Sequence, residues 1–505
     1  MPHSIATTHS ERPRIAIIGG GISGLAAAHR ITELVPKAEL TLFEAANRLG
    51  GVLETIERDG CLVERSADNF LTSRPGGVEL CKRLGLAEQL LPTDETRRRA
   101  HVVRDGRLLP IPAGFYLMSP RRLGPILASP ILSIRGKLRL LAEPLIPPRG
   151  KLSAEAGTGG WGLGTGDESV ASFARRRLGR EVFERLVQPL VAGIYTADSE
   201  QLSMAATMPD FLAYERQFGS LLRATVRMRH PEGTREFGMR NGEEAASGAR
   251  YGLFVAPKQG MRSIVAALAQ RLPGAAVRLN TPVHGIQRTE GDQWLVEFDA
   301  KRQSERFDGV ILSLPAYAVA RALRRFDAHL SAELDGISYA GCVVVSCAFH
   351  GDQIAHPLDS FGFVVPQIEG RRIVAGSFAS NKFPGRAPDS DVLIRTFVGG
   401  SLQPELMDLT DDELRRLVLD ELAELLTITG TPRFTDIARW PQSMPQYHVG
   451  HLARVERIER LAERWPGLAL AGNAYRGVGI PQCISSGEAA AERIAAKWKT
   501  DWPLR

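Results

Sequence analysis

A cluster of glycines near the N-terminus is the strongest chemical signal in this sequence. Gly19, Gly20, Gly21, Ile22, Ser23 and Gly24 follow one another, and Glu44 comes twenty residues later. Glycines let the backbone approach a pyrophosphate closely, and a helix that starts there offers free N–H groups to the anion. A carboxylate at the position of Glu44 can accept hydrogen bonds from ribose hydroxyls. The pattern therefore predicts a dinucleotide-binding site.

The residues around this cluster supply the elements that must position it. Residues 14–18 are an apolar, β-branched run typical of a strand, residues 25–31 predict a helix, and residues 40–43 predict a second strand. Strand, glycine turn, helix and strand within about 30 residues are the opening unit of a doubly wound α/β fold. In that unit Gly19 makes the tight turn, Gly21 faces the pyrophosphate and Gly24 lets the helix pack on the strand.

Two further glycine-rich segments extend the predicted site. Arg48, Gly50 and Gly51 follow Glu44 closely, and a late segment, 472–480, connects an apolar strand to a helix rich in small residues. An internal piece, 251–314, contains a predicted helix that begins at Gly260 and predicted strands at 277–283, 294–298 and 309–314. We therefore expect the cofactor domain to be built from both ends of the chain and this internal piece.

Several motifs, taken in their order along the chain, resemble one family. The Arg48–Gly51 pattern is similar to that of two-dinucleotide-binding-domain flavoproteins. The segment 168–204, together with 105–112, 383–388 and 397–400, resembles the oxygen-dependent protoporphyrinogen and coproporphyrinogen III oxidases. The resemblance runs from about residue 14 to residue 496. One departure is the segment 64–70, where the family often has Gly-Pro in a loop that contacts the flavin.

The resemblance implies a fold class and a division of the chain. We expect an α/β flavoprotein with a Rossmann-like FAD domain, a strand-rich substrate domain and a helical insertion. The FAD domain would comprise residues 1–90, 216–314 and 446–505, and the substrate domain residues 315–445. Residues 91–215 would form the helical insertion at the substrate entry. Its apolar stretch at 111–149 would either face a membrane, as the family's does, or pack as core.

The resemblance also implies site residues. FAD would be held without a covalent bond, although Cys483 lies in the segment that covers the flavin. Besides the glycine cluster and Glu44, the residues expected to bind it are Ala45, Arg48, Gly50, Gly51, Val283, Gly472, Asn473, Val478, Gly479 and Ile480. For the substrate, Phe383 would stack on a pyrrole ring, and Gly193 would let a macrocycle approach the flavin. Either Arg98 or Arg99 would bind a propionate.

No catalytic triad, metal motif or paired-carboxylate signature is present in the sequence, which fits a reaction whose chemistry belongs to the cofactor. We expect no metal site, and we expect His448 and His451 on a surface loop. The resemblance implies hydride transfer from a meso carbon of a porphyrinogen to flavin N5, with loss of a pyrrole N–H proton. Three such rounds remove six electrons, and molecular oxygen, the second substrate, reoxidises the flavin to give hydrogen peroxide.

Three alternatives stay open from the sequence. The porphyrinogen is either protoporphyrinogen IX or coproporphyrinogen III. The protein could instead be another flavin oxidase, for amines or carotenoids, although amine oxidation would need an aromatic pair flanking the flavin that we cannot place. A non-enzymatic relative, the prenyl-binding chaperones of small GTPases, shares the fold but binds no FAD, and the presence of Glu44 and Arg48 argues against it.

Composition excludes several classes. The chain has 505 residues, of which 44% are hydrophobic and 24% charged, as in globular proteins. It has no apolar run long enough for a transmembrane helix and no secretory h-region. A net charge of +6 without a basic, aromatic-rich cluster predicts no nucleic-acid partner. Five scattered cysteines fit a reducing compartment, so we expect a cytoplasmic protein, with peripheral membrane contact and a homodimer left open.

One amphipathic helix is expected within the helical insertion. Val170, Phe173, Ala174 and Leu178 recur at helical spacing and predict a buried face. The segment Arg175–Arg177 lies on the other side, and we expect it to be a solvated surface.

Overall fold

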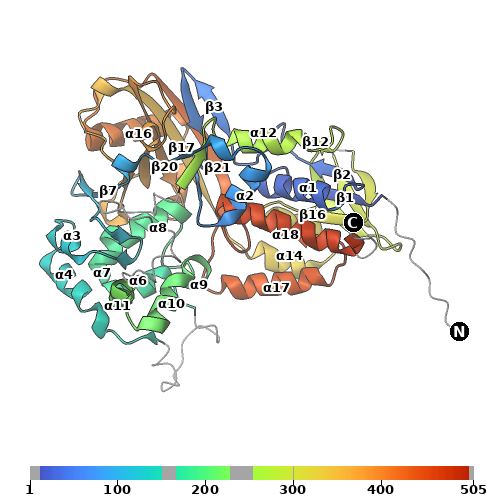
Figure 1. The fold of residues 1–505 in the computed structure, drawn as a ribbon, viewed down its shortest axis with the longest axis horizontal. Coiled ribbons are helices and arrows are strands. Elements are labelled where there is room, and N and C mark those ends of the chain that lie inside the picture. Colours follow the sequence, from blue (N-terminus) through green and yellow to red (C-terminus); the bar gives the residue numbers. More distant parts are fainter. Residues whose placement is uncertain (1–11, 150–166, 228–253, 300, 500–505) are drawn as a thin grey trace.

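A parallel sheet of five strands forms the centre of the first unit (Figure 1). The computed structural model describes residues 12–149, 167–227, 254–299 and 301–499. The strand order is β12 (Val277–Arg278), β2 (Glu39–Phe43), β1 (Arg14–Ile18), β16 (Gly309–Leu312) and β22 (Leu468–Leu470). Alternate residues of β1 enter different apolar clusters, Ile15 and Ile17 on one face and Ala16 and Ile18 on the other. The sheet is therefore buried on both faces, as parallel sheets are.

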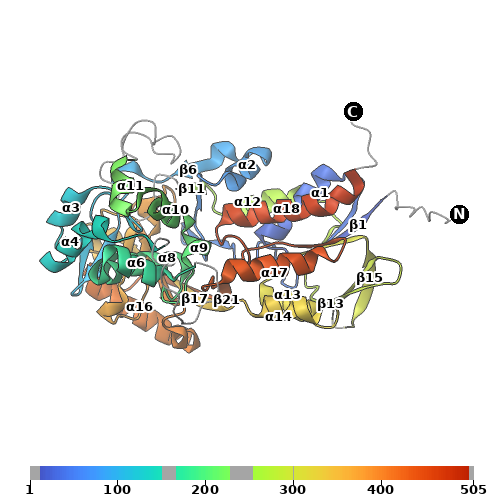
Figure 2. The same cartoon turned by 90° about the horizontal axis from the view of Figure 1, so that it is seen from below.

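Helices cover both faces of this sheet, as Figure 2 shows from below. One apolar cluster joins the sheet to α1 (Ile22–Leu34), α12 (Arg262–Gln270) and α18 (Ile480–Lys499). The cluster on the other face includes α13 (Ala316–Leu323), α14 (Ala328–Asp335) and α17 (His451–Glu463). A three-stranded antiparallel sheet packs on that same face and consists of β13 (Val283–Arg288), β14 (Trp294–Phe298) and β15 (Gln303–Phe307).

A second, seven-stranded sheet forms the other large unit. Its order is β21 (Phe434–Pro445), β17 (Tyr339–His350), β20 (Asp391–Gly399), β19 (Ala375–Phe378), β18 (Gly362–Val364), β7 (His101–Arg104) and β8 (Arg107–Pro110). Helix α16 (Asp411–Leu426) covers one face through an apolar cluster. It begins at a capping box in which the Thr410 hydroxyl accepts from the Glu413 N–H. Strands β7 and β8 come from the segment that we expected to be helical.

Helices dominate the third unit, at the lower left of Figure 1. They are α3 (Leu123–Ala128), α4 (Ile134–Leu141), α6 (Val170–Leu178), α7 (Arg180–Val182), α8 (Gln188–Tyr195), α9 (Met204–Thr207), α10 (Pro209–Phe218) and α11 (Leu221–Arg227). A π-helical turn, Phe183–Val187, separates α7 from α8. Within the described residues, none of the helices has both the length and the apolar character needed to cross a bilayer.

Small elements join the three units. Strands β3 (Thr55–Arg58) and β4 (Cys61–Glu64) form a hairpin, and β9 (Phe115–Tyr116) pairs with β10 (Ser119–Pro120). A three-stranded sheet has the order β5 (Phe70–Leu71), β11 (Phe254–Pro257) and β6 (Leu90–Pro92). Helix α2 (Pro75–Arg83) follows β5, and the short α15 (Ala379–Lys382) connects β19 with β20.

Two local expectations were wrong. The predicted strand 277–283 is two strands, because Asn280 adopts a positive φ of 51° and Pro282 cannot donate to a ladder. The expected solvated surface at Arg175–Arg177 includes Arg177, whose side chain is fully buried. Its guanidinium lies 3.2 Å from carboxylate oxygens of both Glu143 and Glu215, which compensate its charge.

Candidate functional site

The N-terminal glycine turn leaves a space beside the start of α1. Gly19 has a φ of 106°, and a Cβ there would lie 2.4 Å from the carbonyl oxygen of Ser313. A Cβ on Gly24 would lie 1.9 Å from the carbonyl oxygen of Gly19, so helix and turn are in direct contact. In contrast, a Cβ on Gly21 would meet no atom within 4 Å. Helix α1 has no side-chain cap, so its first N–H groups border this open space and can bind an anion.

Glu44 closes the other side of this turn. It follows β2, and its Oε2 accepts the N–H of Gly20 at 2.7 Å while its Oε1 accepts the N–H of Ala46 at 2.7 Å. The structure thus brings together the two parts of the predicted dinucleotide site. Each carboxylate oxygen retains a further lone pair for a ribose hydroxyl.

The second glycine pair lies directly against the first. Gly50 and Gly21 form a parallel bridge, and the N–H of Gly50 donates to the carbonyl of Gly20 at 2.8 Å. The Arg48 guanidinium donates to the carbonyls of Gly51 at 2.8 Å and Leu53 at 3.2 Å. Arg48 therefore stabilises the turn that presents the glycines, and its predicted contact with a diphosphate stays a prediction.

Val283 lies near the carboxylate end of the site. It is the first residue of β13 and is half-buried. Two residues earlier, the N–H of Thr281 donates to the Glu44 carbonyl at 2.8 Å, and the N–H of Asn280 donates to the Ala46 carbonyl at 3.0 Å. These bonds fix the start of β13 beside Glu44. Because Glu44 is expected to bind the ribose, the adenine attached to that ribose would lie on the side of Val283.

The C-terminal glycine segment is held by a tyrosine that sequence analysis missed. The Tyr447 hydroxyl donates to the carbonyl of Asn473 at 2.5 Å and accepts the N–H of Gly477 at 2.9 Å. Its ring stacks on His451, with centroids 3.9 Å apart. His451 is buried and lies 2.9 Å from the Tyr475 carbonyl, so our surface-loop expectation was wrong for this residue. Burial lowers the pKa of His451 to about 4 and keeps it neutral.

Open space also borders this segment. A cavity of about 440 Å³ lies between α17, α18 and the start of α2, and Gly472 and Gly477 are in its wall. Helix α18 begins at Ile480, directly after Val478 and Gly479, and so points its N-terminus at the glycine segment. Cys483 in its first turn is buried, and burial raises the pKa of its thiol to about 12. The thiol is therefore protonated and a poor nucleophile.

The two candidate arginines have different surroundings. Arg98 donates to the Thr93 hydroxyl at 3.2 Å, and the N–H of Asp94 donates to the Lys382 carbonyl at 3.2 Å. Arg98 also lies 3.2 Å from a carboxylate oxygen of Glu95, and the segment that carries it is bonded to Lys382, the residue before Phe383. Arg99 instead lies 3.3 Å from Asp359, in a separate polar group at the start of β7.

Phe383 and Gly193 differ in accessibility. The Phe383 ring is buried, with the Arg386 guanidinium carbon 5.6 Å from the centre of the ring. Gly193 on α8 is exposed, and a Cβ there would lie 3.6 Å from Val364 of β18. Gly193 is thus accessible to solvent and Phe383 is not, and contact of either residue with a substrate stays a prediction.

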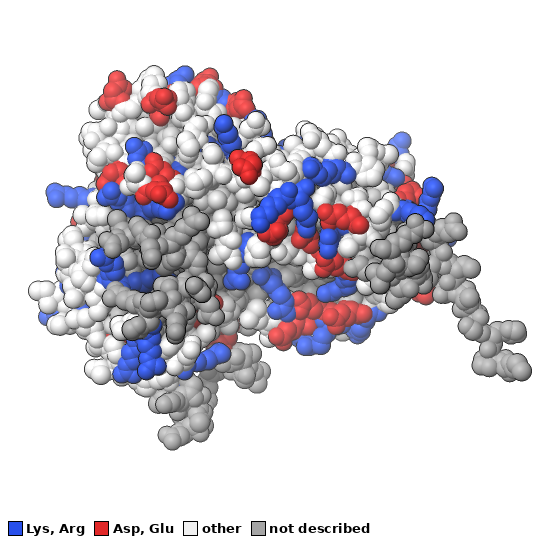
Figure 3. All heavy atoms as spheres, viewed as in Figure 1, with Lys and Arg blue, Asp and Glu red and all other residues white. Residues whose placement is uncertain are grey.

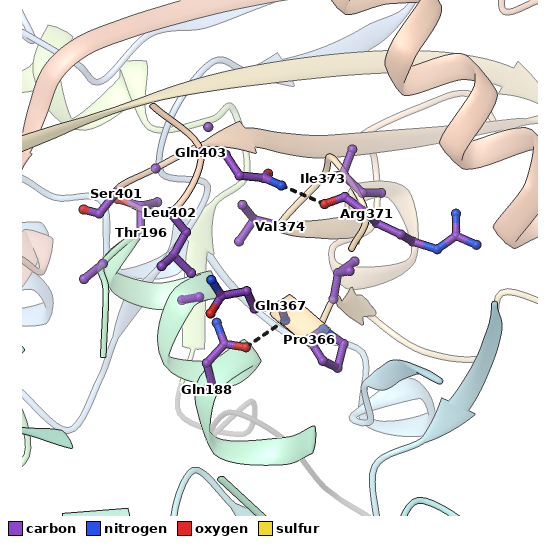
Figure 4. A pocket seen from close by; sticks show the side chains of 15 residues that line it. Gln188, Thr196, Pro366, Gln367, Arg371, Ile373, Val374, Ser401, Leu402 and Gln403 are labelled. Carbon is purple, nitrogen blue, oxygen red and sulfur yellow. Dashed lines mark hydrogen bonds between the residues drawn. The ribbon is translucent and has the colours of Figure 1, made fainter. Parts of the chain in front are cut away.

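A smaller cavity beside α8 is too small for a macrocycle (Figure 4). Its volume is about 90 Å³, well below the several hundred Å³ typical of ligand sites. Gln188 accepts the N–H of Gln367 at 3.0 Å, and Gln403 donates to the Arg371 carbonyl at 2.8 Å. These amides satisfy backbone groups, so the cavity is a polar packing space between the helical unit and the ends of β18 and β20. Among the described residues no group of His, Cys, Asp and Glu side chains could hold a metal ion.

Comparison with known proteins decides the family. Residues 22–495 match the model of the flavin-containing amine oxidoreductases. The chain belongs to this family. It is 32% identical to coproporphyrinogen III oxidase of Staphylococcus aureus, over 96% of this chain and 99% of that protein. It is 30% identical to the mitochondrial protoporphyrinogen oxidase of Nicotiana tabacum, over 96% of this chain and 95% of that protein.

A solved structure gives the same result for the fold. A protein from Exiguobacterium, 30% identical, superposes with a TM-score of 0.81 over 97% of this chain and 99% of that chain. The α/β flavoprotein fold, the family and the oxidoreductase class predicted from the sequence are confirmed.

FAD is the cofactor of this flavin-containing amine oxidoreductase, and the residues present fit it. The open space at Gly21 and the uncapped start of α1 suit a diphosphate, and Glu44 suits a ribose. The individual contacts expected of these residues stay predictions.

Proposed function

We propose that this protein is an FAD-dependent oxidase that converts a porphyrinogen to the corresponding porphyrin. The observation that carries the proposal is the similarity to a coproporphyrinogen III oxidase along 96% of this chain and 99% of that protein. Relatives named protoporphyrinogen oxidase are 28–30% identical over similar lengths, so both porphyrinogens are candidate substrates. The shared chemistry is the removal of six electrons and six hydrogens from a carboxylate-bearing tetrapyrrole.

Bound FAD would accept an electron pair in each of three rounds and return it to molecular oxygen, giving three hydrogen peroxide molecules per porphyrin. The chain itself would bind and orient the macrocycle. The exposed backbone of Gly193 would allow close approach of a flat ring, with Val364 as its neighbour. Because Cys483 is a buried, protonated thiol, we propose that FAD is held without a covalent bond.

We assign the propionate contact to Arg98. The N–H of Asp94 donates to the carbonyl of Lys382, the residue before Phe383, whereas Arg99 lies 3.3 Å from Asp359. A guanidinium and a carboxylate form charge-assisted hydrogen bonds of about 1.5–3 kcal/mol.

The direct test compares initial rates for protoporphyrinogen IX and coproporphyrinogen III side by side, together with peroxide released per porphyrin formed. A ratio of three peroxides per porphyrin with either substrate supports the proposal. Failure of the FAD-loaded protein to oxidise either porphyrinogen, with turnover of an amine or a carotenoid instead, would assign another flavin oxidase activity.

Three neighbouring arginines allow a matched test of the propionate contact. We expect Arg98→Ala to raise KM by about 10- to 100-fold with a smaller effect on kcat, because it removes one charged contact. Arg97→Ala, in an exposed residue of the same run, is the control and should leave KM unchanged. A large KM effect in Arg99→Ala and none in Arg98→Ala would reverse the assignment.

We also propose that α4 and the turn after it contact a membrane surface. Ile134, Leu138, Leu141 and Leu145 recur at helical spacing and are 76%, 62%, 40% and 80% exposed. Figure 3 shows this corner, over α3 and α4, largely in white with blue side chains at its border. An exposed apolar stripe beside basic side chains suits the surface of anionic lipids.

Vesicle flotation tests the membrane contact. The wild-type protein should float with phosphatidylglycerol vesicles more strongly than with phosphatidylcholine vesicles, and Leu138→Ser combined with Leu145→Ser should abolish the difference. Ile368→Ser, which changes an exposed residue elsewhere, is the control. Equal flotation of the double variant and the control would contradict the contact.

All five cysteines are free and buried, which supports a reducing compartment, and we propose the cytoplasm.

A further inference from the structure

Five charged side chains are buried together between the FAD unit and the seven-stranded sheet. The exposed fractions are 1% for Arg395, 2% for Arg386 and Glu64, and 9% for Asp68 and Lys382. The Lys382 ammonium and the Arg395 guanidinium each lie 3.1 Å from the same carboxylate oxygen of Asp68. We call these five residues the buried charge cluster. Buried charges are costly, so a cluster of this kind needs close compensation.

The compensation is incomplete and favours positive charge. The cluster contains three cations and two carboxylates, and Glu64 is partly occupied by the Thr55 hydroxyl at 2.7 Å and the Met261 N–H at 2.8 Å. Burial raises the pKa of Glu64 and lowers the pKa of Lys382, because it disfavours the charged form of each group. Although burial acts the other way, the charges of Lys382 and Arg395 hold the pKa of Asp68 well below its usual range.

Two guanidinium N–H groups of the cluster have no acceptor. They are Nε of Arg395 and Nη1 of Arg386, both inaccessible to solvent. The Glu64 carboxylate lies 3.9 Å from Nη1 of Arg386, beyond hydrogen-bond distance, so this donor is only weakly compensated.

The cluster is connected to the cofactor cradle by one loop, residues 65–69. The Arg395 guanidinium donates to the carbonyl of Ser66. The Ser66 hydroxyl donates at 2.5 Å to the carbonyl of Val52, the residue that follows Gly50 and Gly51. This loop is the segment whose sequence departs from the Gly-Pro pattern. It is fixed to the seven-stranded sheet by Asp68 and Ser66, which contact Arg395, and by Arg65, which pairs with Asp436 at 3.1 Å.

We propose that the buried charge cluster is an electrostatic positioning element that holds loop 65–69 against the flavin and favours reduction of that flavin. Two-electron reduction adds negative charge to the flavin, and a fixed positive charge in a low-dielectric setting stabilises that charge without rearrangement. Lys382 acts here through the field and through Asp68, so it is a positioning residue. The inference rests on the proposed FAD site and is independent of the substrate.

The test measures the midpoint potential of bound FAD by equilibration with a reference dye, without any porphyrinogen. In Lys382→Met the Asp68 charge is less well compensated, and we expect the two-electron equilibrium to shift toward oxidised flavin by at least tenfold, about 30 mV. In the double variant Lys382→Met, Asp68→Asn the pair is neutral again, and the potential should return toward the wild-type value. Lys82→Met, in an exposed Lys on α2, is the control and should not shift it.

Each outcome decides the proposal. A Lys382→Met potential equal to that of the control, or a double variant that shifts as far as the single one, would overturn it. If Lys382→Met loses FAD, recovery of FAD in the double variant supports a charge effect, and loss in both variants shows that only the packing of the Lys382 stem matters. A failure of the proposed function would appear differently, as normal potentials with no porphyrinogen oxidation.

Discussion

Replacing Glu44 by alanine tests the cofactor site at the point where its geometry is best defined. The carboxylate accepts two backbone N–H groups, from Gly20 and Ala46, each at 2.7 Å. Hydrogen bonds to a charged group contribute about 1.5–3 kcal/mol each. The variant loses the ribose acceptor and leaves the phosphate-binding turn less ordered.

Loss of one such bond to FAD corresponds to a rise in Kd of roughly 10- to 100-fold, since 1.4 kcal/mol is tenfold. The measurement is titration of the FAD-free protein with FAD, followed by quenching of flavin fluorescence. Glu44→Gln keeps an acceptor without the charge, so its Kd for FAD should lie between those of the wild type and Glu44→Ala. Glu39→Ala is the matched control, because Glu39 begins the same strand and forms a surface ion pair with Arg14. If Glu44→Ala binds FAD within twofold of Glu39→Ala, the ribose role of Glu44 is refuted.

Three further predictions concern stability. Gly487→Ala should lower the free energy of unfolding, measured by urea titration, by about 1–3 kcal/mol, because its Cβ would lie 2.1 Å from a carbonyl oxygen of α1. Gly274→Ala, at a position with open space around it, is the control and should have little effect. Burial lowers the pKa of His101 to about 4, so below pH 6.5 the unfolded chain binds the proton more readily than the folded protein. The free energy of unfolding should therefore fall between pH 6.5 and pH 4, and it should fall less steeply in His101→Gln. Equal slopes of this free energy against pH in the two proteins would contradict the assignment. Arg177→Met removes the cation beside the fully buried Glu143, while Glu215 keeps its ion pair with Arg176, so the free energy of unfolding should fall by about 3–5 kcal/mol. The exposed Arg180→Ala should leave the melting temperature unchanged, and equal melting temperatures of the two variants would refute the role of the Arg177–Glu143 pair.

The cofactor cradle could be predicted because its signals are local. The turn, helix and strand from Gly19 to Glu44 follow one another within one βαβ unit, so spacing alone places the carboxylate beside the glycines. The C-terminal glycine segment was recognised for the same reason. Tyr447 was missed because nothing in its neighbouring residues distinguishes a hydroxyl that orders backbone from an ordinary buried tyrosine.

Features that depend on long-range contacts were beyond the sequence. Lys382 and Asp68 are 314 positions apart, and their pairing appears only when the two units pack together. Arg177 was expected in solvent because its neighbours are arginines, yet Glu143 and Glu215 from other helices surround it. The choice between Arg98 and Arg99 depended on side-chain surroundings, since adjacent residues with the same side chain give no signal of their own.

The order of strands in the parallel sheet has a consequence for biosynthesis. Strand β16 lies between β1 and β22, so the last strand of the described residues completes a sheet whose first strand was made hundreds of residues earlier. Until β22 and α18 have been made and have left the ribosome, their apolar partners on β16 and α1 remain uncovered. Contacts between such distant segments form slowly. We therefore expect cofactor capture only after β22 and α18 have emerged, and chains shortened before Leu468 to aggregate rather than accumulate as apoprotein.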